Sequence, residues 1–302
     1  MTLEPVIVLA GVAALLSAAL AAAYWGAGLL LHPPTMSPMT IFPEAFGLTY
    51  EKVSFRSSDG LTLAGWFLPS PSGRDKTLLI CHGWGDNKGE FLEQTVFLNR
   101  VEGFNLLYFD FRGCGESEGD QVTMGKMELL DFAAALDYLK TYRPRCAECL
   151  GVFGFSMGAA VAAMSLADRP EIKAAVLESP FADFHQVGRR WAWARFRVPY
   201  FPMIMLVMRL AKFRSGHDDL DAYSPAAFLP AARTPLLMIA GERDVLTPPK
   251  DVRRLYAAAH GPKDFWLVPG ASHSKCRLAA PADYDARVAA FFRTHLPDRR
   301  TG

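Results

Sequence analysis

Short apolar runs alternate with helical segments along most of this 302-residue chain. Glu51–Ser57 and Leu61–Leu68 flank Ser58-Asp59-Gly60, which is typical of a β-hairpin. Further strands are predicted at 77–81, 105–109, 150–155, 174–177, 235–240 and 265–268, and helices at about 90–102, 124–142, 159–164, 249–260 and 280–295. Near-continuous apolar strands separated by helices predict an α/β fold, in which helices cover both faces of a mostly parallel sheet.

One segment, residues 184–227, interrupts this alternation. It is rich in aromatic and basic residues and contains a strongly apolar piece, Phe201–Leu210. An insertion of this size between two strands predicts a helical cap over a site at the edge of the sheet. A surface excursion that packs on itself is the alternative.

The N-terminus differs from the rest of the chain. No Asp, Glu, Lys or Arg occurs from Pro5 to Pro43, and Val6–Leu31 is almost wholly apolar. At ~1.5 Å per helical residue this stretch exceeds the ~30 Å hydrocarbon core of a bilayer. We therefore predict a single-pass membrane anchor at 1–31, a linker at 32–50 and the folded domain at 51–302.

Two alternatives to an uncleaved anchor remain, a signal peptide cleaved near 21–23 and a buried helix. The residues before the span include no Lys or Arg, which is unusual for a signal peptide. Lys52 and Arg56 follow the span, and with the odd number of cysteines they favour a cytoplasmic domain without deciding its side.

Charge and cysteine content narrow the function classes. A net charge of +1 without a run of basic residues predicts no nucleic-acid partner. Five cysteines imply no disulfide framework. Cys146 and Cys149 have zinc-knuckle spacing, but no second pair of Cys or His matches them, so we expect two loop thiols rather than a metal site or a redox pair.

The pentapeptide Gly154-Phe155-Ser156-Met157-Gly158 lies between a predicted strand and a predicted helix. This context is typical of a nucleophile elbow, a tight turn that exposes a serine hydroxyl. The flanking glycines remove Cβ atoms that would clash in such a turn. Ser156 is therefore the candidate nucleophile.

A serine hydroxyl needs a base, usually a histidine held by a carboxylate. In sheets with this elbow the acid and then the histidine follow the serine, each after a strand. His273 fits this order, because the other histidines precede Ser156, lie at helix ends or belong to the insertion. Asp244 is the candidate acid, with Glu178 at the end of an earlier strand as the alternative.

An oxyanion intermediate requires backbone N–H donors. Met157 opens the helix after the elbow and supplies one. The second is expected from Trp84 in Cys81-His82-Gly83-Trp84-Gly85, which follows a predicted strand.

With these motifs in this order, the chain resembles the α/β-hydrolase superfamily from about 51 to 297, and in particular its bacterial serine aminopeptidase-like and esterase-like branch, which often has an N-terminal anchor. The segment 110–117, Asp-Phe-Arg-Gly-Cys-Gly-Glu-Ser, looks like that branch's D-x-R-G-x-G-x-S turn, whose Asp and Arg are expected to brace loops behind the site. The resemblance implies a Ser156, Asp244 and His273 triad, with Trp84 and Met157 as the oxyanion hole.

These expectations lead to a serine hydrolase that cleaves a carboxylic ester, or a thioester, on hydrophobic or lipid-like acyl substrates. It would use an acyl-enzyme and need no metal or organic cofactor. A serine peptidase of the aminopeptidase type and a non-catalytic binding protein with the same fold are the alternatives. The sequence assigns neither the physiological substrate nor the oligomeric state.

Overall fold

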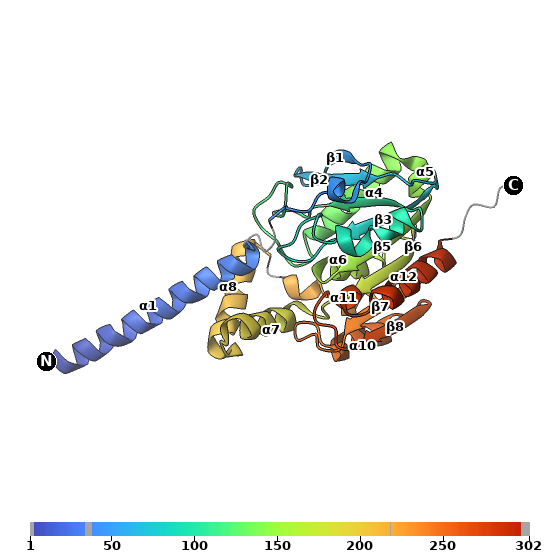
Figure 1. The fold of residues 1–302 in the computed structure, drawn as a ribbon. Coiled ribbons are helices and arrows are strands. Elements are labelled where there is room, and N and C mark those ends of the chain that lie inside the picture. Colours follow the sequence, from blue (N-terminus) through green and yellow to red (C-terminus); the bar gives the residue numbers. More distant parts are fainter. Residues whose placement is uncertain (1–2, 34–37, 218, 297–302) are drawn as a thin grey trace.

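The computed structural model describes residues 3–33, 38–217 and 219–296, and an eight-stranded sheet forms its centre (Figure 1). The strand order is β1-β2-β4-β3-β5-β6-β7-β8. Strand β2 is antiparallel to β1 and β4, and all other neighbours are parallel, which confirms the mostly parallel sheet. The strands are β1 (Glu51–Arg56), β2 (Thr62–Leu68), β3 (Lys76–Cys81), β4 (Asn105–Phe109), β5 (Cys149–Phe155), β6 (Ile172–Glu178), β7 (Leu236–Gly241) and β8 (Lys263–Val268).

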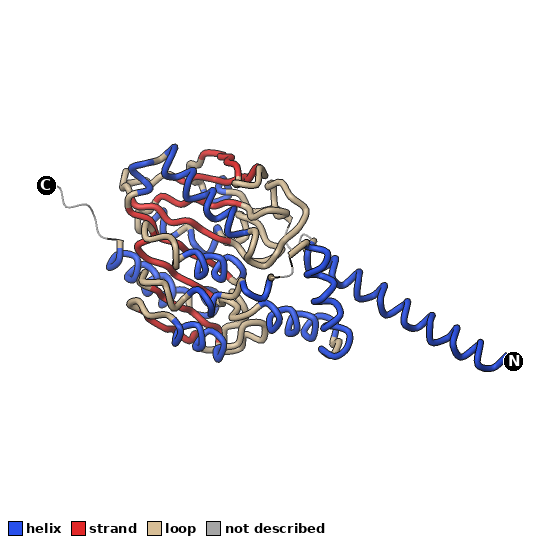
Figure 2. The backbone as a smooth tube through the Cα atoms, turned by 180° about the vertical axis from the view of Figure 1, so that it is seen from behind, coloured by secondary structure: helices blue, strands red, loops and turns tan. Residues whose placement is uncertain are grey.

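Helices cover both faces of this sheet, as Figure 2 shows. Successive side chains of a strand point to opposite faces, so Val152 of β5 belongs to one apolar core and Phe153 to the other. The first core includes residues of α4 (Glu128–Tyr142), α6 (Met157–Ser165) and α10 (Pro249–Ala258). The second includes residues of α2 (Leu92–Thr95), α3 (Phe97–Arg100), α11 (Cys276–Ala279) and α12 (Pro281–His295), while α5 (Pro144–Ala147) precedes β5.

Two helix boundaries differ from the prediction. The single helix expected at 90–102 is two short helices, α2 and α3. There the Thr95 hydroxyl donates to the carbonyl of Phe91 at 2.6 Å, the kind of local bond that competes with a regular helix. The helix expected from Met124 begins only at Glu128, because Met124 and Gly125 have positive φ angles of 56° and 140°.

The N-terminal helix α1 (Leu3–Leu31) projects away from the sheet, so that its first residues lie far from the rest of the chain (Figure 1). Within the described residues, Val6–Leu31 is the one helix long and apolar enough to cross a membrane. Its large apolar side chains from Val6 to Leu20 are exposed. By length and composition, this part has the properties of a membrane span.

The last turns of α1 pack on the folded domain. Ala23, Ala27, Leu30 and Leu31 are buried, and the helix lies against α8 (Met205–Ser215). The carbonyl of Leu31 accepts a 2.7 Å hydrogen bond from the N–H of residue 122, in the loop before α4. The segment predicted as an anchor is thus also part of the packing of the domain.

The predicted linker, 32–50, is only partly described, because 34–37 lie outside the described residues. It contains the short helix η1 (Pro43–Phe46), whose neighbours Phe42 and Tyr50 contact the buried ring of Trp66. Part of this stretch therefore packs on the sheet.

The insertion, residues 184–227, is helical. It consists of α7 (Phe184–Phe196), η2 (Tyr200–Ile204), α8 and η3 (Leu220–Ala222), and α9 (Pro225–Phe228) begins at its end. Asp183 is the N-cap of α7, and its carboxylate accepts a hydrogen bond from the N–H of Gln186. In Figure 1, α7 and α8 lie between the body of the molecule and the projecting α1.

Candidate active site

Ser156 sits in a strained turn between β5 and α6. Its φ angle of 49° and ψ of −111° are outside the regions that a serine ordinarily occupies. A Cβ on Gly154 would lie 2.6 Å from the Cα of Ala159, and one on Gly158 would lie 2.4 Å from the carbonyl oxygen of Cys81. The turn is therefore possible only with glycine at both positions, as the elbow pattern predicted.

His273, in the loop after β8, connects the serine to an acid. Its Nε2 lies 2.9 Å from the Ser156 Oγ, and its Nδ1 lies 2.8 Å from the Asp244 Oδ2. Asp244 follows β7, so the three side chains follow the carboxyl ends of β5, β7 and β8, three parallel strands in the same half of the sheet. The structure brings together the three residues that the sequence analysis selected.

The Asp244 carboxylate is fixed in orientation. Its Oδ1 accepts hydrogen bonds from the N–H groups of Leu246 and Thr247, and its Oδ2 accepts one at 2.7 Å from the Thr247 hydroxyl. Burial raises the pKa of Asp244, but the hydrogen bonds from His273 and Thr247 and the charge of His273 lower it below the usual value. Asp244 is therefore ionised at neutral pH and oriented to hold the Nδ1–H of His273.

Glu178, the alternative acid, makes no contact with the His273 ring. It is buried at the end of β6, where it accepts hydrogen bonds from the Tyr284 hydroxyl and the N–H of Cys276. Burial raises its pKa. Since Cys276 is three residues after His273, Glu178 anchors the loop that carries the histidine.

The two expected N–H donors belong to residues close to Ser156. Trp84 belongs to the turn after β3, and a Cβ on its neighbour Gly83 would lie 3.6 Å from the Ser156 Cβ. Met157 is the first residue of α6. Within the described part of the chain, neither N–H donates to a protein acceptor, so both are free to bind an oxyanion.

His82 supports this turn, a role that the sequence analysis did not assign. Its Nδ1 lies 2.7 Å from the carbonyl oxygen of Gly83, and its Nε2 accepts a 3.0 Å hydrogen bond from the N–H of Phe111. Burial lowers the pKa of His82, so the ring is neutral, with the proton on Nδ1. The His-Gly pair directly after a strand is the signal that pointed to this position.

The turn 110–117 braces the loops behind the site, as the resemblance implied. The Asp110 carboxylate accepts hydrogen bonds from the N–H groups of Lys88 and Glu116 and from the buried Lys88 ammonium. A Cβ on Gly115 would lie 2.2 Å from this carboxylate, so only glycine fits there. Lys88 follows the Trp84 turn, and the network therefore ties that turn to the loop after β4.

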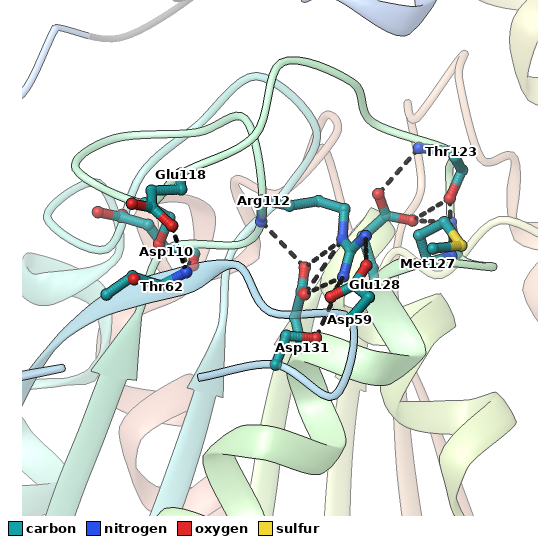
Figure 3. Close-up of polar contacts among 12 residues, drawn as sticks. Asp59, Thr62, Asp110, Arg112, Glu118, Thr123, Met127, Glu128 and Asp131 are labelled. Atoms are coloured by element: carbon teal, nitrogen blue, oxygen red, sulfur yellow. Dashed lines mark hydrogen bonds and ion pairs between the residues drawn. The ribbon is translucent and has the colours of Figure 1, made fainter. Parts of the chain in front are cut away.

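Arg112 of the same turn binds two acidic residues (Figure 3). Its guanidinium contacts Asp131 of α4 at 2.6 Å and Asp59 of the β1–β2 turn at 2.7 Å. In the same view, the Glu128 carboxylate accepts hydrogen bonds from the N–H and the hydroxyl of Thr123. These contacts fix the position of the loop that brings Met124 to the site.

A reaction pocket of about 230 Å³ opens at Ser156 and His273. One side is apolar, with Leu30 from α1, Val187 and Trp191 from α7, and the ring of Trp84. The Trp84 indole N–H donates to the carbonyl of Leu30 at 3.1 Å, so α1 is directly tied to the turn that carries an oxyanion donor.

The other side of the reaction pocket is polar, with Asp86, Glu90, Gln94 and Lys275. Burial, with a smaller effect of Glu90, raises the pKa of Asp86 to about 6. This wall can accept the polar part of a ligand.

The described residues form no cluster of three or more His, Cys, Asp or Glu placed to hold a metal ion. None of the five cysteines, which all lie among the described residues, forms a disulfide, and this includes Cys146 and Cys149.

Comparisons with known proteins agree with this geometry. A family model described as "Serine aminopeptidase, S33" matches residues 72–222. The uncharacterized protein Rv2307c of Mycobacterium tuberculosis is 30% identical over 246 residues, 81% of this chain and 78% of that protein. The α/β hydrolase domain-containing protein WAV2 of Arabidopsis thaliana is 27% identical over 86% of this chain and 84% of its own.

Among solved structures, the esterase Pf2001 of Pyrococcus furiosus superimposes with a TM-score of 0.75 at 26% identity. The superposition covers 88% of this chain and 98% of the esterase. The similarity to this enzyme thus extends over most of the chain.

Proposed function

This chain belongs to the serine aminopeptidase S33 family within the α/β-hydrolase superfamily, and from that premise we propose that it is a serine hydrolase that cleaves carboxylic esters. The observation that carries the proposal is the hydrogen-bonded series Ser156–His273–Asp244 beside the reaction pocket. Its esterase structural neighbour adds support.

In the first half of the reaction, the Ser156 Oγ attacks the ester carbonyl carbon as its proton passes to the His273 Nε2. The carbonyl oxygen becomes an oxyanion, which accepts hydrogen bonds from the N–H groups of Trp84 and Met157. Asp244 stabilises the imidazolium. The C–O bond then breaks, and His273 returns the proton to the departing alcohol, which leaves an acyl group on Ser156.

In the second half, water enters and His273 Nε2 takes one of its protons. The hydroxide oxygen attacks the acyl carbon through a second oxyanion in the same position. Collapse of this intermediate releases the carboxylic acid and returns the proton to the Ser156 Oγ. Each proton and leaving group is accounted for, and no redox partner is needed.

A peptidase is the second candidate, and one observation favours it. Asp86 and Glu90 lie in the reaction pocket, and carboxylates attract the α-ammonium group of a peptide. An aminopeptidase would place that ammonium group against these residues. The apolar wall formed by Leu30, Val187 and Trp191 favours the ester candidate, because it suits a hydrocarbon acyl group.

We further propose that α1 is retained as a membrane anchor and that the insertion serves as a cap. The exposed apolar surface from Val6 to Leu20 supports the anchor. The 2.7 Å hydrogen bond from Arg214 to the carbonyl of Tyr24, together with the buried Ala23, supports retention, since it ties the segment to the insertion. Lys52 and Arg56 favour the cytoplasmic side for the domain.

The nucleophile assignment is tested with a fluorophosphonate activity probe on the full chain in detergent. We expect the probe to label the wild type at Ser156 and to leave Ser156→Ala unlabelled. Beside it, p-nitrophenyl esters and aminoacyl-anilides, assayed on one preparation, separate the esterase from the peptidase. If Ser156→Ala is labelled as strongly as the wild type, Ser156 is not the nucleophile. If neither protein is labelled, the result supports a non-catalytic binding protein.

A further inference from the structure

A second cavity, of about 320 Å³, lies between α1 and the insertion. We call it the apolar chamber. Its wall contains no charged residue, and its lining is hydrocarbon and aromatic: Ala22, Trp25, Gly26, Leu29, Leu30, Gly188, Trp191, Ala192, Phe196, Val198, Met203, Ile204, Val207 and Met208. Cavities of this size hold small-molecule ligands, whose sites span roughly 300–1,000 Å³.

The chamber adjoins the reaction pocket. Leu30, Gly188 and Trp191 line both spaces. The ring of Trp191 meets that of Trp84 edge to face, with centroids 5.2 Å apart, so the shared wall is next to an oxyanion donor. A Cβ on Gly188 would lie 3.0 Å from the sulfur of Met208, so glycine lets α7 and α8 pack closely where the two spaces meet. Among the described residues, only the shared side chains of Leu30 and Trp191 and this glycine lie between Ser156 and the chamber.

The opposite end of the chamber lies toward the membrane-span part of α1. Ala22, Trp25 and Gly26 form this wall, directly after the exposed apolar stretch that ends at Leu20. The turn between α7 and α8 lies on the side toward which α1 projects in both ribbon views, and it exposes the aromatic side chains of Phe196 and Phe201. If α1 spans a bilayer, these residues meet its surface.

We propose that the chamber binds the long acyl chain of a membrane-lipid ester, which enters from the bilayer between α1 and the insertion. The proposal rests on the ester hydrolase function. The ester carbonyl lies at Ser156, and the alcohol lies against Asp86 and Glu90. An acyl chain is the occupant that fits, because the lining contains no charged side chain and is almost wholly hydrocarbon and aromatic, so burial of methylene groups is favourable there whereas burial of a polar group is costly.

The test narrows the membrane end of the chamber. Ala22→Trp puts a large ring into its wall, whereas Ala21→Trp puts the same ring on an exposed neighbour that does not line it. Val207→Trp fills the chamber from α8 and serves if the first variant does not fold. The full chain is reconstituted in phosphatidylcholine vesicles, and kcat/KM is measured for p-nitrophenyl palmitate and p-nitrophenyl butyrate.

We expect the palmitate-to-butyrate ratio of kcat/KM to fall at least about tenfold in Ala22→Trp and Val207→Trp, the equivalent of about two methylene contacts. Ala21→Trp should keep the wild-type ratio. The proposal is wrong if the palmitate-to-butyrate ratio stays unchanged in both chamber variants. It is also wrong if the ratio falls equally in the control Ala21→Trp. Fluorophosphonate labelling of Ser156 in the same vesicles distinguishes failure of this proposal from failure of the proposed function. If the probe does not label the wild type, the proposed hydrolase function is wrong; if it does, only the acyl-chain proposal is.

Discussion

Different forces hold the triad Ser156–His273–Asp244 and the apolar wall of the reaction pocket. In the triad, the Asp244 carboxylate accepts four hydrogen bonds, and His273 bridges it to Ser156. On the apolar wall, Leu30 and Trp191 are placed mainly by packing between α1 and the insertion. Hydrogen bonds are directional and weaken steeply when misaligned, whereas apolar burial scales with area and has no direction.

This difference explains what the triad and the apolar wall can do. Proton transfer requires reacting atoms at hydrogen-bond distance, so the triad must be rigid. The apolar wall needs only to exclude water from an acyl chain, and it can accept chains of several lengths. We therefore expect changes to the triad to affect turnover on every substrate, and changes to the apolar wall to affect stability and substrate preference.

The largest effect should come from the acid. Asp244→Asn should lower kcat by about 10⁴-fold, because the amide favours the wrong tautomer of His273. Glu178→Gln should lower kcat by no more than about tenfold, since Glu178 holds the histidine loop only through Cys276. Turnover of p-nitrophenyl butyrate measures both. A larger loss of turnover in Glu178→Gln than in Asp244→Asn would show that Glu178, at the end of β6, is the acid.

A smaller effect, on stability, should follow removal of the last turns of α1. A chain that begins at Phe46 loses the buried Leu30 and Leu31, and its free energy of unfolding should fall by about 3 kcal/mol or more. A chain that begins at Leu20 keeps them and should stay within about 0.5 kcal/mol of the full chain. Urea unfolding in detergent measures both.

Equal stability of the two truncated chains would show that α1 is only an anchor. The sequence analysis predicts an anchor at 1–31 and a separate folded domain at 51–302, and on that prediction a chain that starts near Phe46 would fold without loss. The contacts of Trp84 and residue 122 with the end of α1 lead us to expect a loss instead.

The smallest effect concerns Asp86, a buried carboxyl that faces Glu90, His273 and Lys275. Its pKa in the folded protein is raised to about 6, so between its unfolded value and pH 6 the folded state binds the extra proton and stability falls as the pH rises. Asp86→Asn should therefore raise the free energy of unfolding at pH 8 by about 1–3 kcal/mol and change it little at pH 4.

Urea titrations at the two pH values measure this difference, with the exposed Asp264→Asn as the control. A gain that is the same at pH 4 and pH 8 would mean that the carboxylate charge is not the cause. A stabilising replacement in the pocket is typical of a residue kept for function rather than for folding.

The sequence by itself selected Ser156 and His273 and reduced the candidate acids to Asp244 and Glu178. It could do so because a strand, a tight turn and a helix leave a signature within a few residues. The order of parallel strands then implies which turns share an edge. The predicted helix boundaries at Met124 and within 90–102 were wrong. They depend on backbone angles and side-chain hydrogen bonds that hydrophobic periodicity does not report.

Only the tertiary structure decided the apolar wall. Nothing near Leu30 in the sequence indicates that its carbonyl accepts the indole N–H of Trp84, 54 positions later. Likewise, the choice between Asp244 and Glu178 was open until the distances to His273 were known. From sequence, the apolar stretch of α1 could be an anchor, a signal peptide or a buried helix, and the stretch 201–210 could belong to a cap or to an excursion that packs on itself. Apolar burial carries no directional code, so which surfaces meet is settled when the whole chain packs.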